Sequence, residues 1–514
     1  MSNSLPILTS IKSDWKAISE SPFLGKDVLE LLSSSMYVNP LSIYREYVQN
    51  ATDSIEEAVA LGLLRRSDEG RIEITIDSQA RVIRIRDNGT GVPESQFVRR
   101  LIALGASRKR GHKARGFRGV GRLAGLGYCQ ELVFRTRADG DRQVSELRWD
   151  CRQLKTVLRD AHYSEQLGQV ISQVVRMRKT VDATYPDRFF EVELIGLVRH
   201  GTDRLMNASA VSSYLSQVAP VPFAPSFSFA EKIESALTKH VALGNVGVFI
   251  NGSAEPLYRP HRDSFVARKG HEDSHVDVDI LEIPGSDGRL AAIGWIAQHG
   301  YCGAISTDAE IAGLRLRCGN IQVGEGDLLN DLFQEPRFNS WAVGEIHVLD
   351  ERILPNGRRD HFEQSVHFND LVGHLGPLAM NVSRLCRLSS VQRNRSKQLE
   401  LMHQTIENSL SILEQRSVTK ERWRSLREST LTKFDALQKT VSRQEQSVKE
   451  NWTSKLKKLE KRIGSLGPAR ENVTKHILTP RERRFFDVLY EVLPQAPTTK
   501  ILVDRILAKM NLKG

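Results

Sequence analysis

The sequence has few cysteines and no long apolar run. Its five cysteines are scattered along 514 residues without a Cys-x-x-Cys pair, so neither a zinc site nor a disulfide framework is indicated. No segment approaches the roughly 20 consecutive apolar residues of a membrane-spanning helix, and residues 1–16 lack the apolar core of a signal peptide. These absences favour a reducing compartment, and we expect a cytoplasmic protein without membrane contact.

Proline and glycine are missing from about residue 380 to residue 463. Within this stretch apolar residues recur at spacings of three and four, the period of one helix face. A long segment without helix breakers and with such a seam predicts a coiled coil or a helical hairpin over residues 379–465. We expect the remaining residues, 466–514, to form a small helical C-terminal unit.

Acidic residues are too few to balance the basic ones. The formal net charge is +11 and the sequence pI is about 9.4. Such a balance favours acidic partners, although charge alone does not distinguish nucleic acid from a solvated surface. At 514 residues the chain is long enough for several domains, because single cores stop growing at roughly 250–300 residues.

Three polar residues share one face of a predicted helix near the N-terminus. Glu46, Asn50 and Asp53 stand at i, i+4 and i+7 in the segment 41–61, whose other side is apolar. Such a stripe can face a ligand.

Two glycine-containing turns follow. The segments 71–77 and 81–86 alternate with the period of two that is typical of strands, and the second leads into Asp87-Asn88-Gly89-Thr90-Gly91. Glycine permits positive φ and lets a ligand approach the backbone, and an aspartate at a strand end can accept a hydrogen bond from an exocyclic amine. Further on, residues 116–121 read Gly-Phe-Arg-Gly-Val-Gly, which can present backbone amides to phosphates.

These three blocks, in this order and at these separations, resemble the GHKL superfamily of gyrase, heat-shock protein 90, histidine kinases and MutL. The resemblance implies an ATPase that uses ATP and Mg²⁺. Glu46 would polarise the attacking water, Asn50 would help to hold Mg²⁺, and Asp87 would bind the adenine amino group. The predicted nucleotide-binding residues are Asn50, Asp53, Asp87, Gly89, Gly91, Ser107, Lys109, Gly116, Phe117, Arg118, Gly119, Val120, Gly121 and Thr184.

The lid contacts and the threonine in this set are taken from the family pattern. The basic segment 93–115 stands where the superfamily carries its ATP lid, and Ser107 and Lys109 are its candidate phosphate contacts. Family members place a threonine near the adenine on a late strand. Thr184 is the nearest analogue here, but it lacks the glycine that precedes that threonine in the family.

A segment from Val343 to Asp360 resembles the part of the heat-shock protein 90 middle domain that reaches the γ-phosphate. It contains Leu354-Pro355-Asn356-Gly357-Arg358-Arg359-Asp360, and spacing from the asparagine selects Arg359 as the second catalytic residue. A cation on a separate domain can stabilise transition-state charge and couple domain closure to hydrolysis. Arg358, and the pair Arg315 and Arg317 on an alternating strand, are weaker alternatives.

The predicted fold class is α+β with four parts. They are a Bergerat-type α/β sandwich ATPase domain at residues 1–200, a transducer-like α/β middle domain at 201–378, the coiled coil or hairpin at 379–465, and the small helical unit at 466–514.

Three functions remain open. The first is a heat-shock protein 90-like machine, an ATP-driven homodimeric clamp that acts on a protein client or a co-encoded subunit. The second uses the same engine as a MutL- or MORC-like clamp on duplex DNA in repair or genome defence. The third is a nucleotide-binding interaction subunit with negligible turnover, against which the retained Glu46 argues.

Overall fold

The chain forms two compact units, residues 1–387 and residues 388–514. The structure is a computed structural model, and each unit is described by itself. The residues described are Lys26, 39–103, 121–160, 166–199, 201–268, 271–415, 420–444, 446–467, Arg484, Phe485 and Val488.

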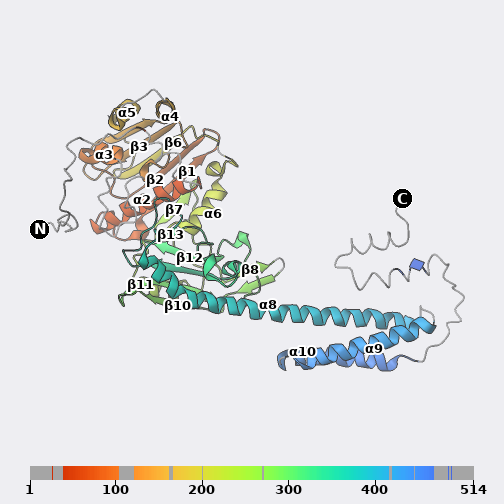
Figure 1. Cartoon of the computed structure of the whole chain (residues 1–514). Coiled ribbons are helices and arrows are strands. Elements are labelled where there is room, and N and C mark those ends of the chain that lie inside the picture. The colour runs from red at the N-terminus through yellow and green to blue at the C-terminus, as the bar shows by residue number, and fades with distance from the viewer. Residues whose placement is uncertain are drawn as a thin grey trace, which may run out of the picture. The chain divides into compact units, whose positions relative to one another are not determined.

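The N-terminal part of the first unit is a seven-stranded sheet with helices on one face (Figure 1). Its strand order is β5-β4-β3-β6-β2-β1-β7. The strands are β1 Arg71–Asp77, β2 Val82–Asp87, β3 Glu131–Arg137, β4 Val144–Asp150, β5 Val175–Thr180, β6 Phe189–Ile195 and β7 Gly247–Ile250. The helices are α2 Ser42–Ala60, α3 Glu94–Ile102, α4 Cys151–Arg159, α5 Leu167–Val174 and α6 Ala208–Val218.

The two faces of this sheet differ in chemistry. Along β1 every second residue is buried, and these residues join the core that contains α2 and α6. The opposite face carries ion pairs between neighbouring strands, such as Arg135 with Glu193 at 2.6 Å and Arg86 with Glu191 at 2.6 Å. The pattern confirms the predicted α/β sandwich, because only one face of the sheet is apolar.

The predicted domain boundary at residue 200 does not coincide with the edge of this sheet. β7 pairs with β1 in parallel, from Arg71 opposite Gly247 to Ile74 opposite Ile250. Residues 205–221 also supply side chains to the first core, and α6 packs on α2. Local patterns could not predict this pairing, since β7 lies far from β1 along the chain.

The rest of the first unit is built on a five-stranded sheet of order β10-β11-β14-β12-β13. Its strands are β10 Asp277–Pro284, β11 Leu290–Gln298, β12 Gly313–Cys318, β13 Ile321–Val323 and β14 Val343–Val348, and a separate hairpin joins β8 Ser264–Arg268 to β9 His271–Ser274. One core includes the start of α8 (Val366–Gln415), and another includes α7 (Ala230–Leu237). A β-sheet core with helices agrees with the predicted α/β middle domain.

The described residues of the second unit include three helices where the sequence predicted a coiled coil or a helical hairpin. α8 continues to Gln415, α9 spans Lys420–Ser442, and α10 spans Gln446–Ser465. One apolar core joins all three, with Leu399 and Ile406 from α8, Phe434 from α9 and Trp452 from α10. Helices α8 and α10 run in the same direction, because the ion pairs between them advance along both. These pairs are Lys455–Glu400 at 2.8 Å and Arg462–Glu414 at 2.8 Å.

Most of the predicted C-terminal unit lies outside the described residues. Within the part of the chain that the structure describes, no helix is both long enough and apolar enough to cross a membrane.

Candidate active site

Helix α2 carries the predicted polar stripe into the interior of the first domain. The side chains of Glu46 and Asp53 are almost fully buried, and Asn50 is half-buried. The helix spans Ser42–Ala60, as its apolar period predicts, and packs against β2. Two carboxylates and an amide therefore stand on one face of a helix that lies on the sheet.

The backbone after the glycine-rich segment lies directly against Glu46. A Cβ atom added to Gly121 would collide with the Glu46 carboxylate, so a larger residue there would displace that side chain. The Tyr47 hydroxyl, one residue further along α2, fixes this segment: it accepts a hydrogen bond from the Gly125 amide (3.0 Å) and donates to the Arg122 carbonyl (3.2 Å). The other residues predicted in this segment and in the lid lie outside the described residues: Ser107, Lys109, Gly116, Phe117, Arg118, Gly119 and Val120.

Asp87 ends β2 as a buried carboxyl with only 4% of its surface exposed. Burial raises the pKa of Asp87 to about 7, although the Gly89 amide, which donates to its Oδ1 at 2.9 Å, and the Ser54 hydroxyl oppose the shift. The carboxyl keeps unused acceptor capacity, since an ionised carboxylate has about four acceptor sites.

The turn after Asp87 is held close to α2 and β3. Gly91 has φ +65°, and a Cβ atom there would meet the Arg137 carbonyl. The Thr90 amide donates to Ser54 Oγ (3.0 Å), and the Val92 amide donates to Thr136 Oγ1 (2.9 Å). Gly89 and Gly91 were predictable from the sequence, because both follow the strand-ending Asp87 within four residues.

The structure places Thr184 away from this turn. It lies in the exposed connection between β5 and β6, where its hydroxyl donates to Asp182 Oδ1 at 2.6 Å. Thr136 has the position on the sheet that Thr184 was expected to occupy: it pairs with Phe190, which pairs with Asp87 on the other side. Thr136 is buried and donates to the Phe189 carbonyl at 2.8 Å. The sequence contained one sign against a role for Thr184 at the adenine: the glycine that precedes this threonine in the family is missing.

A loop of the middle domain reaches α2. Arg359 is buried and has φ +56°, a conformation that is uncommon for a residue with a side chain and is found where surrounding structure imposes it. Its carbonyl accepts from the Gly324 amide (2.9 Å), and its own amide donates to the Asn356 carbonyl (3.1 Å). Burial lowers the pKa of Arg359, while the charge of Glu46 opposes this shift, so the guanidinium lies in the field of that carboxylate. Arg358, by contrast, is exposed.

Arg45 joins the two domains at this point. It donates to the Arg358 carbonyl at 2.8 Å and to the Arg359 carbonyl at 3.4 Å, and it forms an ion pair with Glu46 at 3.4 Å. Arg45 was not among the residues predicted from the sequence, because its partner Arg358 lies 313 residues away in the chain. Ser54 and Thr136 were not among them either, because their roles depend on contacts between separate elements.

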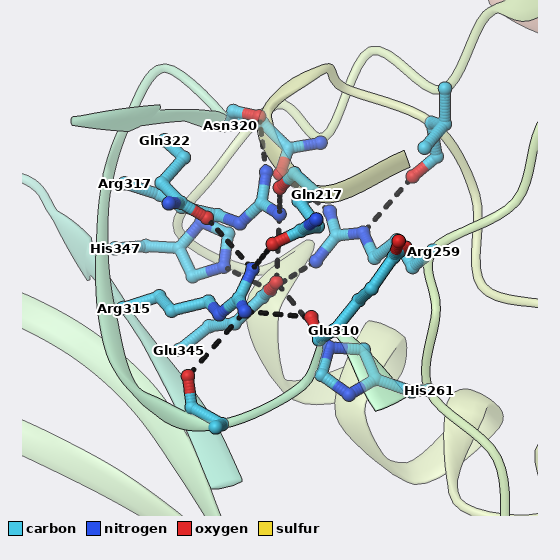
Figure 2. Close-up of polar contacts among 12 residues, drawn as sticks. Gln217, Arg259, His261, Glu310, Arg315, Arg317, Asn320, Gln322, Glu345 and His347 are labelled. Carbon is cyan, nitrogen blue, oxygen red and sulfur yellow. Dashed lines mark hydrogen bonds and ion pairs between the residues drawn. The ribbon is translucent and has the colours of Figure 1, made fainter. Parts of the chain in front are cut away.

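A second buried polar cluster lies between the end of α6 and the middle sheet (Figure 2). Glu345 on β14 forms ion pairs with Arg259 and, at 2.8 Å, with Arg317 on β12. Arg317 also donates to the Gln217 carbonyl at the end of α6 (2.6 Å), and Arg315 donates to the Gln217 side chain (3.0 Å). The two arginines do share one face of the strand, as predicted, but they bind the end of α6 here.

Charge in this cluster depends on the arginines. Burial would raise the pKa of Glu345, but Arg259 and Arg317 lower it well below its usual value. Burial lowers the pKa of His261 and of His347 to about 4, so both rings are neutral at physiological pH. Through the hydrogen bonds of Arg315 and Arg317 to Gln217, the cluster connects α6 with the sheet that carries the Arg359 loop. α6 in turn packs on α2.

The described residues fit a nucleotide with Mg²⁺. The backbone of Gly121 lies against the Glu46 carboxylate, the backbone of Gly91 lies against the Arg137 carbonyl, and Asp87 is a buried acceptor. Among the described residues, no group of three or more His, Cys, Asp or Glu side chains could hold a metal ion. Asn50 on the polar stripe of α2 would hold Mg²⁺ together with phosphate oxygens and water, a common arrangement for this ion.

Comparison with known proteins places part of the first unit in a known family. Residues 41–175 match the family model of the histidine kinase-, DNA gyrase B- and HSP90-like ATPases. The N-terminal domain is a GHKL ATPase domain. The match confirms the predicted superfamily, and it covers the segment that holds Glu46, Asn50, Asp87 and Gly121.

Relatives of the GHKL domain include bacterial proteins named Chaperone protein HtpG. The chain is 36% identical to that of Chlorobium phaeobacteroides over 87 residues, 16% of this chain and 14% of the relative. It is 32% identical to that of Psychrobacter arcticus over 139 residues, 24% and 21% of the two chains. It is 25% identical to that of Klebsiella pneumoniae over 209 residues, 37% and 30% of the two chains. The matches thus span less than a third of each relative.

Proposed function

We propose that this chain is an ATP-hydrolysing conformational machine of the heat-shock protein 90 kind. The observation that carries the proposal is the buried contact between the two domains: Arg45 holds the loop of Arg359 against the helix that carries Glu46. A nucleotide-binding domain without turnover has no need of a buried cation presented by a second domain.

The described residues divide the chemistry among them. Asp87 accepts a hydrogen bond from the adenine amino group, and the turn of Gly89 and Gly91 lets the base approach. Glu46 polarises the water that attacks the γ-phosphate and takes up its proton. Asn50 would hold part of the coordination shell of Mg²⁺, which when bound would supply positive charge to neutralise the phosphates. Arg359 stabilises the negative charge that develops on the transferred group.

Coupling of the two domains follows from the position of the arginine. Arg359 belongs to a loop that follows β14, so the complete site exists only when that loop lies on α2. Hydrolysis therefore reports on domain closure, and nucleotide binding favours closure. A difference in affinity of about 1.4 kcal/mol between two states shifts their ratio tenfold.

The protein partners of this chain are also part of the proposal. Relatives named as chaperones support a protein client, and we propose a homodimer that closes on a client or on a co-encoded subunit in the cytoplasm.

Steady-state ATP hydrolysis by the purified protein tests the mechanism. Glu46→Ala should bind ATP and lose hydrolysis by about a hundredfold or more, the range of general-base catalysis. Arg359→Ala should also lose turnover while it keeps affinity for ATP. Glu57→Ala, which changes an exposed carboxylate on the same helix, is the matched control and should behave as the wild type.

Two outcomes would contradict the proposal. Normal turnover by Glu46→Ala would show that the catalytic assignment is wrong. Tight ATP binding by the wild type without Glu46-dependent turnover would instead favour a nucleotide-binding interaction subunit.

A further inference from the structure

The net positive charge of this protein is confined to its second unit. Residues 1–387 contain 47 basic and 48 acidic side chains, whereas residues 388–514 contain 26 basic and 14 acidic ones. The domains that form the ATPase site are therefore close to neutral.

α9 and α10 together carry seven of the twelve excess positive charges of this unit. α9 carries six basic and three acidic residues, and α10 carries six basic and two acidic residues. The acidic residues of α8 in this unit are engaged within the bundle: Glu400 binds Lys455, and Glu407 and Glu414 bind Arg462. Other basic side chains of α9 and α10 face solvent, namely Arg422, Arg424, Arg427, Lys439, Lys457, Lys458 and Lys461.

The apolar side chains of α9 and α10 are turned inward. Trp423, Phe434 and Trp452 are at most 7% exposed and pack in or against the bundle core. Among the described residues of these two helices, no large apolar side chain is exposed. Such a surface offers nothing to insert into a lipid layer and no aromatic face on which single-stranded bases could stack.

A basic, hydrophilic surface on rigid helices matches the phosphate backbone of a duplex. α10 has 20 residues, about 30 Å at the helical rise of about 1.5 Å per residue. Lys457 and Lys461 stand one turn apart on it, and Lys458 lies beside them. Duplex DNA presents one negative charge per about 1.7 Å of its axis, so several lysines can bind phosphates at once without reading bases.

We propose that α9 and α10 form a sequence-independent binding surface for duplex DNA. The surface works by charge and lies in the unit that does not contain the ATPase site. DNA binding should therefore not require nucleotide.

The test is binding of the full chain to a fluorescent DNA duplex of random sequence, measured by anisotropy over a range of salt. Affinity should fall steeply with salt. The triple variant Lys457→Gln, Lys458→Gln, Lys461→Gln should bind roughly tenfold or more weakly, and its plot of log affinity against log salt should be less steep by about 2 to 3, since each phosphate contact contributes about 0.9.

A matched control removes the same charge from the first unit. Arg65, Arg142 and Lys239 are all exposed there, and their simultaneous replacement by Gln should leave DNA binding unchanged. Helical circular dichroism of both triple variants checks the fold. Glu46→Ala should bind DNA as the wild type does, so failure of the ATPase proposal and failure of this one are separate results.

Three outcomes would overturn the proposal. They are equal affinity of the two triple variants for DNA, affinity that does not change with salt, and binding to vesicles with anionic lipid in the absence of binding to duplex.

Discussion

Asp87 is a buried carboxyl, and its charge state sets the strength of the hydrogen bonds that it accepts. Because burial raises its pKa to about 7, part of the folded population holds the proton near neutral pH. The ionised form accepts a hydrogen bond from an amino group more strongly than the acid does. We expect affinity for adenosine, which has no titrating phosphate, to rise as pH increases from about 6 to about 8. Isothermal titration at several pH values measures this.

Replacement of Asp87 provides the control for that pH profile. Asp87→Asn should abolish ATP binding, because the amide turns a donor or a weak acceptor toward the adenine amino group. Asp139→Asn, an exposed change in the same domain, should keep both the affinity and its pH dependence. A profile that is flat in the wild type would mean that another residue accepts the hydrogen bond.

Gly121 is the residue at which backbone and catalytic side chain meet. A methyl group at this position would push the Glu46 carboxylate aside. Displacement of a catalytic group by about 1 Å can cost about a hundredfold in rate, so Gly121→Ala should bind ATP and lose most of its turnover. The control is Gly168→Ala, where the structure has open space around the added atom. Equal turnover of the two variants would refute this account of the site.

At the scale of elements, the buried cluster of Figure 2 joins α6 to the middle sheet through charge. Glu345→Gln removes the carboxylate that lies between Arg259 and Arg317 and leaves buried guanidinium charge uncompensated. Loss of one partner of a buried ion pair costs about 3–5 kcal/mol, and we expect a fall of that order in the free energy of unfolding. Chemical denaturation measures it, and Glu282→Gln, exposed on β10, is the control. A loss below about 0.5 kcal/mol, the usual effect of a surface change, would show that the cluster does not stabilise the junction.

Local periodicity predicted those elements that depend on neighbouring residues. α2, β1 and β2 appear within a residue or two of their expected ranges, since burial of one face imposes a period of 3.6 or 2. β4 and β5 were missed because their residues alternate less clearly and pair with strands fixed elsewhere. β7 lies in residues that were assigned to the middle domain, because its partner β1 lies about 175 residues earlier in the chain. In the site, glycines and carboxylates in motifs were found, whereas Arg45 and Thr136 act through contacts between separate elements.

At the scale of the whole molecule, the two units have separate cores and different responses to acid. Burial lowers the pKa of three histidines, His261, His275 and His347, to about 4, and all three lie in the first unit. Their unfolded pKa is about 6.5, so between about pH 6.5 and pH 4 the unfolded chain binds more protons than the folded one. The stabilising contribution of these three histidines to the first unit is therefore complete above about pH 6.5 and is lost as the pH falls toward about 4, by up to about 1.4 kcal/mol per pH unit for each histidine.

The helical unit should outlast the first unit in acid, since its core is formed by leucine, phenylalanine and tryptophan side chains from three helices. We expect an acid titration followed by circular dichroism to show loss of tertiary signal and of sheet before the helical signal disappears. His275→Leu fills the same buried space without a titrating ring and should move the first transition to lower pH, because one source of proton uptake on unfolding is gone. A single transition in which all signals disappear together, unchanged in His275→Leu, would mean that the units do not unfold separately and that this histidine does not set acid stability.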